Sequence, residues 1–312
     1  MVIQMNDDAR VVMIDGSIVA PEHAVVSVYD RGFLYGDSVF ETLRSYQGRP
    51  FASRSHIDRL FLSARKVRIQ MPVSEVELER EVETVVETFG TTDAAVRIQV
   101  TRGLGPLGLS TAEAKKPLLV ILASPVHPPS LADYQNGIGV VIVRTERTAD
   151  NTPAAGAKVG NYLVSVMAME QAQAAGAKEA IIVDGRGRVL EGTTSNVFVV
   201  HGGTVLTPPE SVGILPGITR KLLIDVACEL EMPVKITTLT TGDLLSADEV
   251  FISSTVREVL PVVAVDGQSV GNGMVGSQTR AIHRRFRQKF GIVGPMPWEA
   301  SARNDNGVSC ED

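Results

Sequence analysis

The alternation of apolar and polar residues predicts a series of short strands. Residues 11–14 are apolar, and the Asp15-Gly16 pair after them favours a tight hairpin turn. In residues 39–46, Phe40 and every second residue after it share one face of a predicted strand, which a Gln47-Gly48 turn ends. Further strands are predicted at residues 95–101, 180–183, 188–190, 196–200, 204–206 and 249–252.

Apolar residues spaced three and four apart predict helices between these strands. Ser74 and Glu77 form a capping box, and the helix that they open has an apolar stripe from Leu78 to Phe89, after which Gly90 ends it. Further helices are predicted at residues 55–67, 161–175, 219–231 and 277–290. The mixture of strands and helices predicts an α+β or α/β protein.

A proline-rich segment divides the chain of 312 residues, a length that suits one large or two modest domains. Residues 124–136 (SPVHPPSLADYQN) contain three prolines and no apolar periodicity, so they predict a connector. We therefore expect a small N-terminal α/β domain at residues 1–123 and a larger C-terminal domain at residues 137–295. The polar segment at residues 296–312 is predicted to be a disordered tail.

Charge and cysteine content narrow the class of protein. The formal net charge of −6 argues against a surface that binds polyanions such as nucleic acid. The two cysteines, Cys228 and Cys310, lie far apart in the sequence and predict neither a disulfide framework nor a metal site. Because no apolar stretch reaches membrane-spanning length and the N-terminus has no signal pattern, we expect a cytoplasmic protein without a membrane partner.

The residues with the clearest chemical potential lie between residues 154 and 200. Lys158 stands among small residues, Tyr162 follows four positions later, and Glu191 comes thirty-three residues after the lysine. A lysine amine can form a Schiff base with an aldehyde cofactor, and a carboxylate beside a pyridine nitrogen keeps the ring protonated. A lone lysine in a loop of small residues is nevertheless typical of a solvated surface. The three residues indicate a site only together with other motifs.

Six such motifs occur in the order in which a known family has them. They are residues 30–37 (DRGFLYGD), 56–60 (HIDRL), 158–163 (KVGNYL), 190–192 (LEG), 213–220 (GILPGITR) and 253–255 (SST). Together they resemble the class IV (fold-type IV) pyridoxal-phosphate enzymes, which include branched-chain amino acid aminotransferases, D-amino acid aminotransferases and aminodeoxychorismate lyases. The resemblance spans roughly residues 10–292. It implies two domains joined by an interdomain loop, with the active site between them.

The resemblance implies pyridoxal phosphate (PLP) as the cofactor. Lys158 would be the catalytic residue, which holds the cofactor and moves the proton at the substrate's α-carbon. Glu191 would pair with the ring nitrogen, and Tyr162 would bind the phenolic oxygen of the ring. The other implied cofactor-binding residues are Arg59, Ser195, Asn196, Gly217, Ile218, Thr219, Ser254 and Thr255. Residues 217–219 precede a predicted helix, whose N-terminus attracts anions such as phosphate.

Substrate positions follow from the branched-chain aminotransferases, to which the motifs are most similar. Tyr35, Phe40 and Arg97 stand where that group has a pocket tyrosine, an aromatic wall and a pocket arginine. The loop at residues 102–109 is similar to one that reaches the neighbouring subunit's pocket, which implies a homodimer. D-amino acid aminotransferases carry an arginine on this loop to hold the α-carboxylate, and Leu107 occupies that position here.

Other positions depart from the branched-chain pattern. Thr42 replaces a usual glycine, which could narrow the pocket, and residues 194–196 and 253–255 are more similar to the D-amino acid enzymes. Arg257 follows Val256 at a position where the branched-chain group has a small residue. It could bind a substrate carboxylate or pair with Glu258 or another surface acid, and Arg44 is a second candidate for binding a carboxylate.

The sequence as a whole favours a dimeric PLP-dependent aminotransferase of fold type IV. We expect it to exchange an amino group between an amino acid, foremost an L-branched-chain amino acid, and 2-oxoglutarate. The alternatives within the family are a D-amino acid or R-selective amine transaminase and an aminodeoxychorismate lyase, which Arg97 disfavours. A relative that binds a phosphate ligand without chemistry is the alternative outside enzymes, and the pair Lys158 and Glu191 argues against it.

Overall fold

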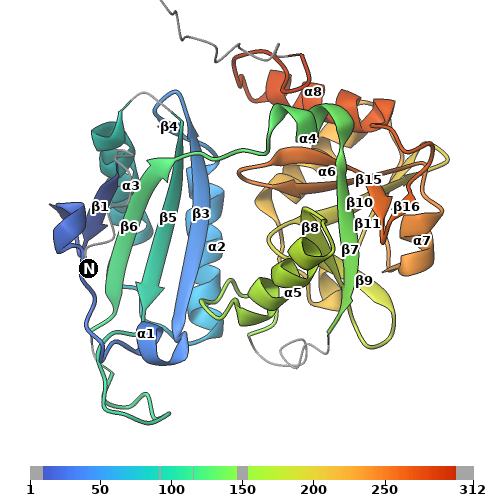
Figure 1. The fold of residues 1–312 in the computed structure, drawn as a ribbon. Helices are drawn as coiled ribbons and strands as arrows, with labels where there is room; N and C mark the ends of the chain where they lie inside the picture. Colours follow the sequence, from blue (N-terminus) through green and yellow to red (C-terminus); the bar gives the residue numbers. More distant parts are fainter. Residues whose placement is uncertain (1–9, 91–92, 115, 146–153, 300–312) are drawn as a thin grey trace, which may run out of the picture.

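The computed structural model describes residues 10–90, 93–114, 116–145 and 154–299. Two β-sheets stand side by side in it (Figure 1), one built from strands up to Pro125 and the other from strands that begin at Ile138. The first sheet contains β2 (Ser17–Val19), β1 (Val11–Ile14), β6 (Leu118–Pro125), β5 (Ala94–Thr101), β3 (Ser38–Tyr46) and β4 (Arg49–Pro50), in that order.

Two helices cover one face of the first sheet, α2 (Ser53–Lys66) and α3 (Glu75–Phe89). The predicted capping box at Ser74 and Glu77 is present, and the apolar stripe of α3 packs on the sheet. The hairpin after residue 14 is also confirmed. The other face of β3 and β5 carries Phe40 and Arg97, so the alternation of side chains sends one set into the core and the other toward the second sheet.

The second sheet is larger and mixes parallel and antiparallel pairs. Its strands, in order, are β12 (Val234–Ile236), β11 (Thr204–Thr207), β10 (Asn196–His201), β14 (Glu249–Ser254), β15 (Glu258–Val265), β7 (Ile138–Arg144), β8 (Glu179–Val183), β9 (Arg188–Gly192) and β13 (Leu239–Thr240), with β16 (Gln268–Ser269) paired to β15. The chain crosses from β7 to its parallel neighbour β8 through helix α5 (Leu163–Ala174).

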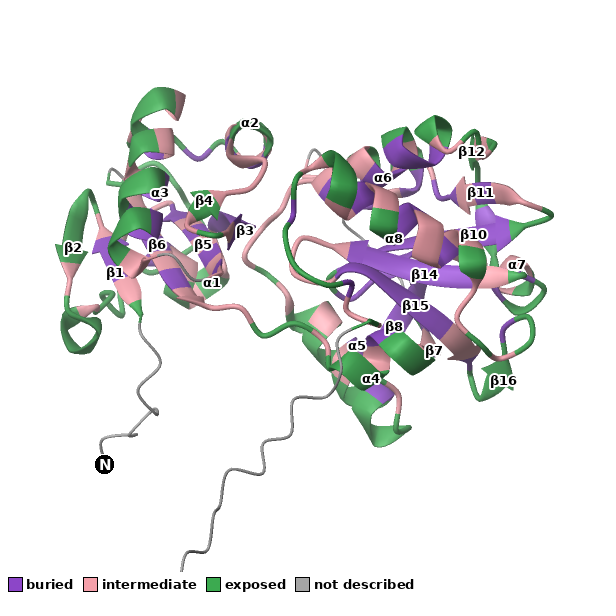
Figure 2. Cartoon of the chain, turned by 90° about the horizontal axis from the view of Figure 1, so that it is seen from above, coloured by how far each residue is buried: buried purple, intermediate pink, exposed green. Residues whose placement is uncertain are grey.

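Helices α6 (Ile218–Glu229) and α8 (Ser277–Lys289) pack on one face of β10 and β14. Figure 2 shows β14 and β15 buried along most of their length. The remaining helices are short: α1 (Arg31–Tyr35), α4 (Leu131–Asn136), α7 (Thr241–Leu245) and the 3-10 turns at Pro21–His23 and Glu210–Val212. None of the described helices has both the length and the apolar character that crossing a bilayer requires.

The expectation of an irregular connector at residues 124–136 is wrong in part. Strand β6 runs on to Pro125, and helix α4 occupies Leu131–Asn136, so only residues 126–130 lie between elements. Ser130 and Asp133 form a capping box at the start of α4, a local signal that the proline content of the segment obscured.

Two further expectations need correction. Strand β15 is absent from the sequence prediction because every residue after Glu258 is apolar, as in strands buried on both faces, and one of them is Pro261. The start of the supposed tail packs against α8: Met296 is buried, and the ring of Trp298 lies 5.1 Å from that of His283. The rest of the tail, residues 300–312, lies outside the described residues.

Candidate active site

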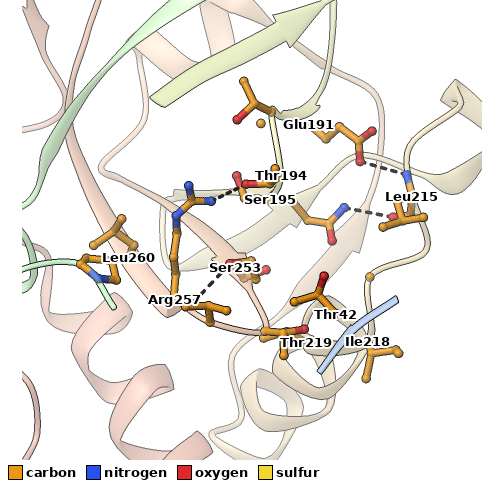
Figure 3. A pocket seen from close by; sticks show the side chains of 18 of the residues that line it. Thr42, Glu191, Thr194, Ser195, Leu215, Ile218, Thr219, Ser253, Arg257 and Leu260 are labelled. Atoms are coloured by element: carbon orange, nitrogen blue, oxygen red, sulfur yellow. Dashed lines mark hydrogen bonds between the residues drawn. The ribbon is translucent and has the colours of Figure 1, made fainter. Parts of the chain in front are cut away.

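A pocket of about 600 Å³ lies between the two sheets. Phe40, Thr42, Arg59 and Arg97 line it from the first sheet and α2, and His127 lines it from the segment between the sheets. The second sheet and its loops supply most of the rest (Figure 3). Lys158 lines the same pocket, so the residue around which the sequence motifs are arranged lies between the two halves of the molecule.

The loop that carries Lys158 is held against the edge of β3. The backbone N–H of Phe40 donates to the carbonyl of Lys158 at 3.0 Å, and the N–H of Gly160 donates to the carbonyl of Ser38 at 2.8 Å. A Cβ at residue 160 would stand 2.0 Å from the Ser38 hydroxyl oxygen, so glycine allows this approach without displacing the Ser38 side chain. The loop is thereby fixed to the sheet, which positions the lysine side chain.

The amine of Lys158 has two aromatic neighbours. Its Nζ donates a hydrogen bond of 3.0 Å to the hydroxyl of Tyr162, and it stands 4.3 Å from the centre of the Phe40 ring. The rings of Phe40 and Tyr162 meet edge to face at 5.0 Å. This packing holds the amine at the floor of the pocket and leaves it within reach of a ligand there.

Glu191 and Asn196 reach the same turn from two strands. Glu191 lies within β9, not after it, and its Oε2 accepts a 2.9 Å hydrogen bond from the N–H of Leu215. The side-chain amide of Asn196, at the start of β10, donates to the Leu215 carbonyl at 3.1 Å. The turn that leads into α6 is therefore fixed from both sides, as the dashed lines of Figure 3 show.

The N-terminus of α6 opens into the pocket. Gly217 is its N-cap residue, no side chain caps it, and Ile218 and Thr219 form its first turn. The N–H groups of a first turn lack partners within the helix and favour an anion. Ser254, the last residue of β14, and Thr255 line the same pocket and add hydroxyl groups.

Arg59 faces this anion site and is fixed by a buried carboxylate. Its Nε and Nη2 each donate to Glu41 at 2.7 Å, and its Nη1 donates to the carbonyl of Pro216 at 2.8 Å. Burial by itself would raise the pKa of Glu41, but Arg59 and His56 hold that pKa down to about 2. The sequence analysis gave Glu41 no role. An acid among apolar residues, opposite the HIDRL motif, was the available signal.

The substrate side of the pocket contains a second arginine. The guanidinium of Arg97 lies 3.8 Å from the centre of the Phe40 ring, and it donates to the side-chain oxygen of Gln99 at 2.9 and 3.1 Å. Among the described residues, no carboxylate lies within ion-pair distance of it. Burial lowers the pKa of Arg97, and Tyr162 opposes this shift only in part. Arg97 is thus a cation at the pocket surface that is not matched by an acid.

Three expected substrate residues do not line the pocket within one chain. Tyr35, at the end of α1, accepts a 2.8 Å hydrogen bond from the N–H of Gly108, and Leu107 beside it is 73% exposed. Arg44 binds Asp93 at 2.8 Å and Glu258 at 3.1 Å. It shares a strand face with Phe40, but four residues of strand, roughly 13 Å, separate the two, so Arg44 lies beyond the pocket.

Of the two possibilities for Arg257, the structure shows pairing with an acid, although the acid is buried and is not Glu258. Its guanidinium lines the pocket but pairs with Glu179, not Glu258, at 3.1 Å, and its Nη1 also donates to the hydroxyl of Thr194 at 3.0 Å. Glu179, in β8, is fully buried, and the sequence analysis missed it. Three other residues of the expected site, Thr42, Ser195 and Val256, also line the pocket.

A sequence model of the family described as "Amino-transferase class IV" matches residues 38–265. The chain belongs to the class IV aminotransferases. It is 40% identical to "Putative branched-chain-amino-acid aminotransferase" of Methanocaldococcus jannaschii, over 90% of this chain and 98% of the relative. It is 34% identical to the D-alanine aminotransferase of Bacillus licheniformis, over 89% of this chain and 96% of the relative.

Among solved structures, the T.th. branched-chain amino acid aminotransferase with pyridoxamine 5'-phosphate is similar to this class IV aminotransferase with a TM-score of 0.86. The two are 30% identical, and the match covers 92% of this chain and 96% of the other. Enzymes of this class use PLP, and the chain is therefore a PLP-dependent aminotransferase of fold type IV, of the branched-chain or D-amino acid type.

The pocket of this class IV aminotransferase fits a phosphorylated ring. A Cβ at residue 217 would stand 1.8 Å from the side-chain oxygen of Asn196, and one at residue 192 would stand 2.1 Å from the hydroxyl oxygen of Ser195. Both glycines therefore leave room for the Asn196 and Ser195 side chains against the backbone that lines the pocket, beside the uncapped first turn of α6. Glu191 and Arg59 line the same pocket and provide the opposite charges that a pyridinium and a phosphate require.

Proposed function

We propose that the protein transfers the amino group of an L-branched-chain amino acid to 2-oxoglutarate. The observation that carries the proposal is the composition of the pocket around Lys158. Apolar side chains from both halves of the molecule line it, and Arg97 is a cation without an acidic partner among the described residues. The apolar side chains suit an aliphatic amino acid, and Arg97 suits the additional carboxylate of the acceptor. Phe40, Ile138, Val256 and Leu260 are among these apolar side chains.

Several of the chain's residues would hold the cofactor in this scheme. Glu191 would bind the ring nitrogen and Tyr162 the phenolic oxygen, while Ser195 and Asn196 support the ring site. Arg59, the first turn of α6, Ser254 and Thr255 would bind the phosphate. PLP, when bound, withdraws electrons from the substrate's α-carbon so that a proton can leave it. The family resemblance implies these roles, and the placement of the residues around one pocket supports them.

Lys158 would then act on that proton. Its Nζ is held by the Tyr162 hydroxyl at 3.0 Å, above the ring of Phe40. A neutral amine in this position can take the proton from the α-carbon and return it to the cofactor. Phe40 and Tyr162 restrict the directions open to the side chain, which favours transfer between two nearby atoms over loss to solvent.

We further propose that two copies of the chain form a homodimer. Large apolar side chains are exposed on α1, on the loop that follows β5 and on the first turns of α5. These segments adjoin one another, because Gly36, after α1, lies against Asn161, just before α5, and Tyr35 in α1 accepts a hydrogen bond from Gly108 in the loop. An exposed apolar area of this kind favours association. The side chains are Phe33, Leu104, Leu107, Leu109, Leu163 and Val166.

A D-amino acid donor is the second candidate. The D-alanine aminotransferase of B. licheniformis is 34% identical to the chain. Ser195 and Ser254, which belong to the two motifs that are more similar to the D-amino acid enzymes, line the pocket. Leu107 argues against a D-amino acid donor, because a leucine cannot bind the α-carboxylate as the loop arginine of the D-amino acid aminotransferases does.

The absorbance spectrum of the holoenzyme separates the two candidates. L-leucine and D-alanine are each added without an amino acceptor, and the band of bound PLP is followed. We expect L-leucine alone to convert this band to that of the amine form of the cofactor. Conversion by D-alanine alone would refute the L-branched-chain donor, and a protein without a cofactor band after addition of PLP would refute the cofactor assignment.

A further inference from the structure

Two arginines line the substrate side of the pocket, and they differ in whether a carboxylate pairs with them. Arg97 reaches it from β5 and has only the amide oxygen of Gln99 as a polar side-chain partner among the described residues. Arg257 reaches it from the other half of the molecule and forms an ion pair of 3.1 Å with Glu179. In Figure 3, Arg257 extends to Thr194, on the side of the pocket away from Leu215 and Ile218.

Glu179 is the buried member of this ion pair, and several hydrogen bonds hold its carboxylate in place. Its Oε1 accepts from the backbone N–H groups of Ala180 and Thr193, at 2.9 and 3.2 Å, and from the hydroxyl of Thr193. Its Oε2 accepts from the hydroxyl of Ser195 at 3.3 Å and pairs with Arg257. The carboxylate is fully buried, and Arg257 is the cation paired with it among the described residues.

The consequence is that Arg257 is not available to a substrate carboxylate at low cost. Moving its guanidinium toward a ligand would leave a buried carboxylate without its cation, which is strongly unfavourable. The guanidinium is also held by Thr194, so that its aliphatic stem lies along the pocket wall beside Val256. Arg97 has no such constraint.

We propose that Glu179 is a specificity-determining residue: by neutralising Arg257 it makes the wall formed by the second sheet suitable for an aliphatic side chain and leaves carboxylate binding to Arg97. Glu179 acts through Arg257 and does not touch the substrate. This inference rests on the proposed function, because it assumes that the pocket takes both an aliphatic amino acid and a dicarboxylate. It favours, of the two possibilities for Arg257, pairing with an acid over direct binding of a substrate carboxylate.

Glu179→Gln tests the inference with little disturbance of the core. A glutamine can keep its side-chain oxygen where Oε1 accepts three hydrogen bonds, and its amide can donate to Ser195, but it cannot neutralise Arg257. The double variant Glu179→Gln with Arg257→Met is the matched control, because it removes both charges together and leaves no buried charge unpaired.

The measurement is calorimetric titration of each holoenzyme with two acids that cannot donate an amino group. Glutarate has the two carboxylates of the proposed acceptor, and 4-methylpentanoate has the one carboxylate and the aliphatic chain of the proposed donor. We expect Glu179→Gln to bind glutarate roughly tenfold more tightly than the wild type, because a hydrogen-bonded charge becomes available. We expect 4-methylpentanoate to gain less, and the double variant to bind glutarate as the wild type does.

Weaker binding of glutarate by both variants would overturn the inference, since Arg257 would then be a carboxylate receptor that Glu179 merely orients. Unchanged glutarate binding in Glu179→Gln would overturn it as well. If Glu179→Gln does not fold, the double variant alone decides between the two roles of Arg257. If the wild type binds neither acid, the proposed function fails, an outcome that is separate from any difference between variants.

Discussion

Two buried glutamates, Glu41 and Glu258, each bind a histidine and an arginine, but they have different structural roles. Glu41 binds His56 at 2.9 Å and Arg59 at 2.7 Å. Glu258 binds His283 at 2.7 Å and Arg44 at 3.1 Å. Burial by itself would raise both carboxyl pKa values, but the neighbouring cations and histidines hold each of them at about 2.

The difference lies in what the arginines contact next. Arg59 continues to the Pro216 carbonyl and lines the pocket, so the Glu41 cluster presents a cation to the ligand site. The Glu258 cluster connects the two halves of the molecule: Arg44 and Tyr46 reach Glu258 from β3, and Arg287 reaches it from α8. The same set of groups thus serves once to orient a functional side chain and once to join two sheets.

Removing the two carboxylates should expose this difference most strongly. Glu258→Ala leaves two arginines without their buried acid, so we expect the free energy of unfolding to fall by about 3–5 kcal/mol. Glu41→Ala should cost less, because Arg59 borders the open pocket and can be hydrated there. Urea unfolding at pH 7 measures both. A larger loss in Glu41→Ala would contradict the division of roles.

Conservative replacement of the arginines should separate binding from stability. Lysine cannot reproduce the paired contact of Arg59 with both oxygens of Glu41, so Arg59→Lys should raise the dissociation constant of PLP roughly tenfold. Arg44→Lys is the matched control in the other cluster and should change that constant by less than about twofold while lowering the melting temperature by a few degrees. Equal effects on PLP binding would show that both clusters support the cofactor site.

The smallest expected effect is in the pH dependence of stability. Burial lowers the pKa of His56 and His283 below their ordinary 6.5, so the unfolded chain takes up protons first as the pH falls below 6.5. The folded state must then lose stability. The glutamates act in the same direction at lower pH: their contribution is complete above 4.5, their ordinary value, and disappears toward 2.

Urea unfolding at pH 7, 5.5 and 4 should therefore show a steady decline, and replacing either histidine by glutamine should reduce the decline between pH 7 and 5.5 by about 1 kcal/mol or less. A free energy of unfolding that stays constant from pH 7 to 4 would show that neither cluster depends on neutral histidines.

Local sequence patterns predicted the parts of the fold and site that depend on neighbours in the chain. The capping box of α3, the hairpin after residue 14 and the N-terminus of α6 are of this kind. Lys158 and Tyr162 lie four residues apart and were readily associated, and Glu191 followed from the family motif.

Long-range pairings could not be derived in the same way. Arg44 and Arg97 look alike in two alternating strands, and only the register of β3 against β5 shows which one reaches the pocket. Glu179 lies in a strand buried on both faces, and nothing near it in the sequence points to Arg257. The arginines of the site could therefore be proposed from motifs, but the acids that orient or neutralise them required the fold.

The most direct test of the account concerns the choice between the two lysines that line the pocket. Lys158 is held by Tyr162, whereas Lys178 is 65% exposed and lies 3.8 Å from Asp133. Borohydride makes a bond between a lysine and bound PLP permanent, and mass spectrometry of the digested protein then locates it. We expect the modification on Lys158, and its loss in Lys158→Ala together with a fall in turnover of about 10⁴-fold. Modification of Lys178, or full turnover in Lys158→Ala, would contradict the account.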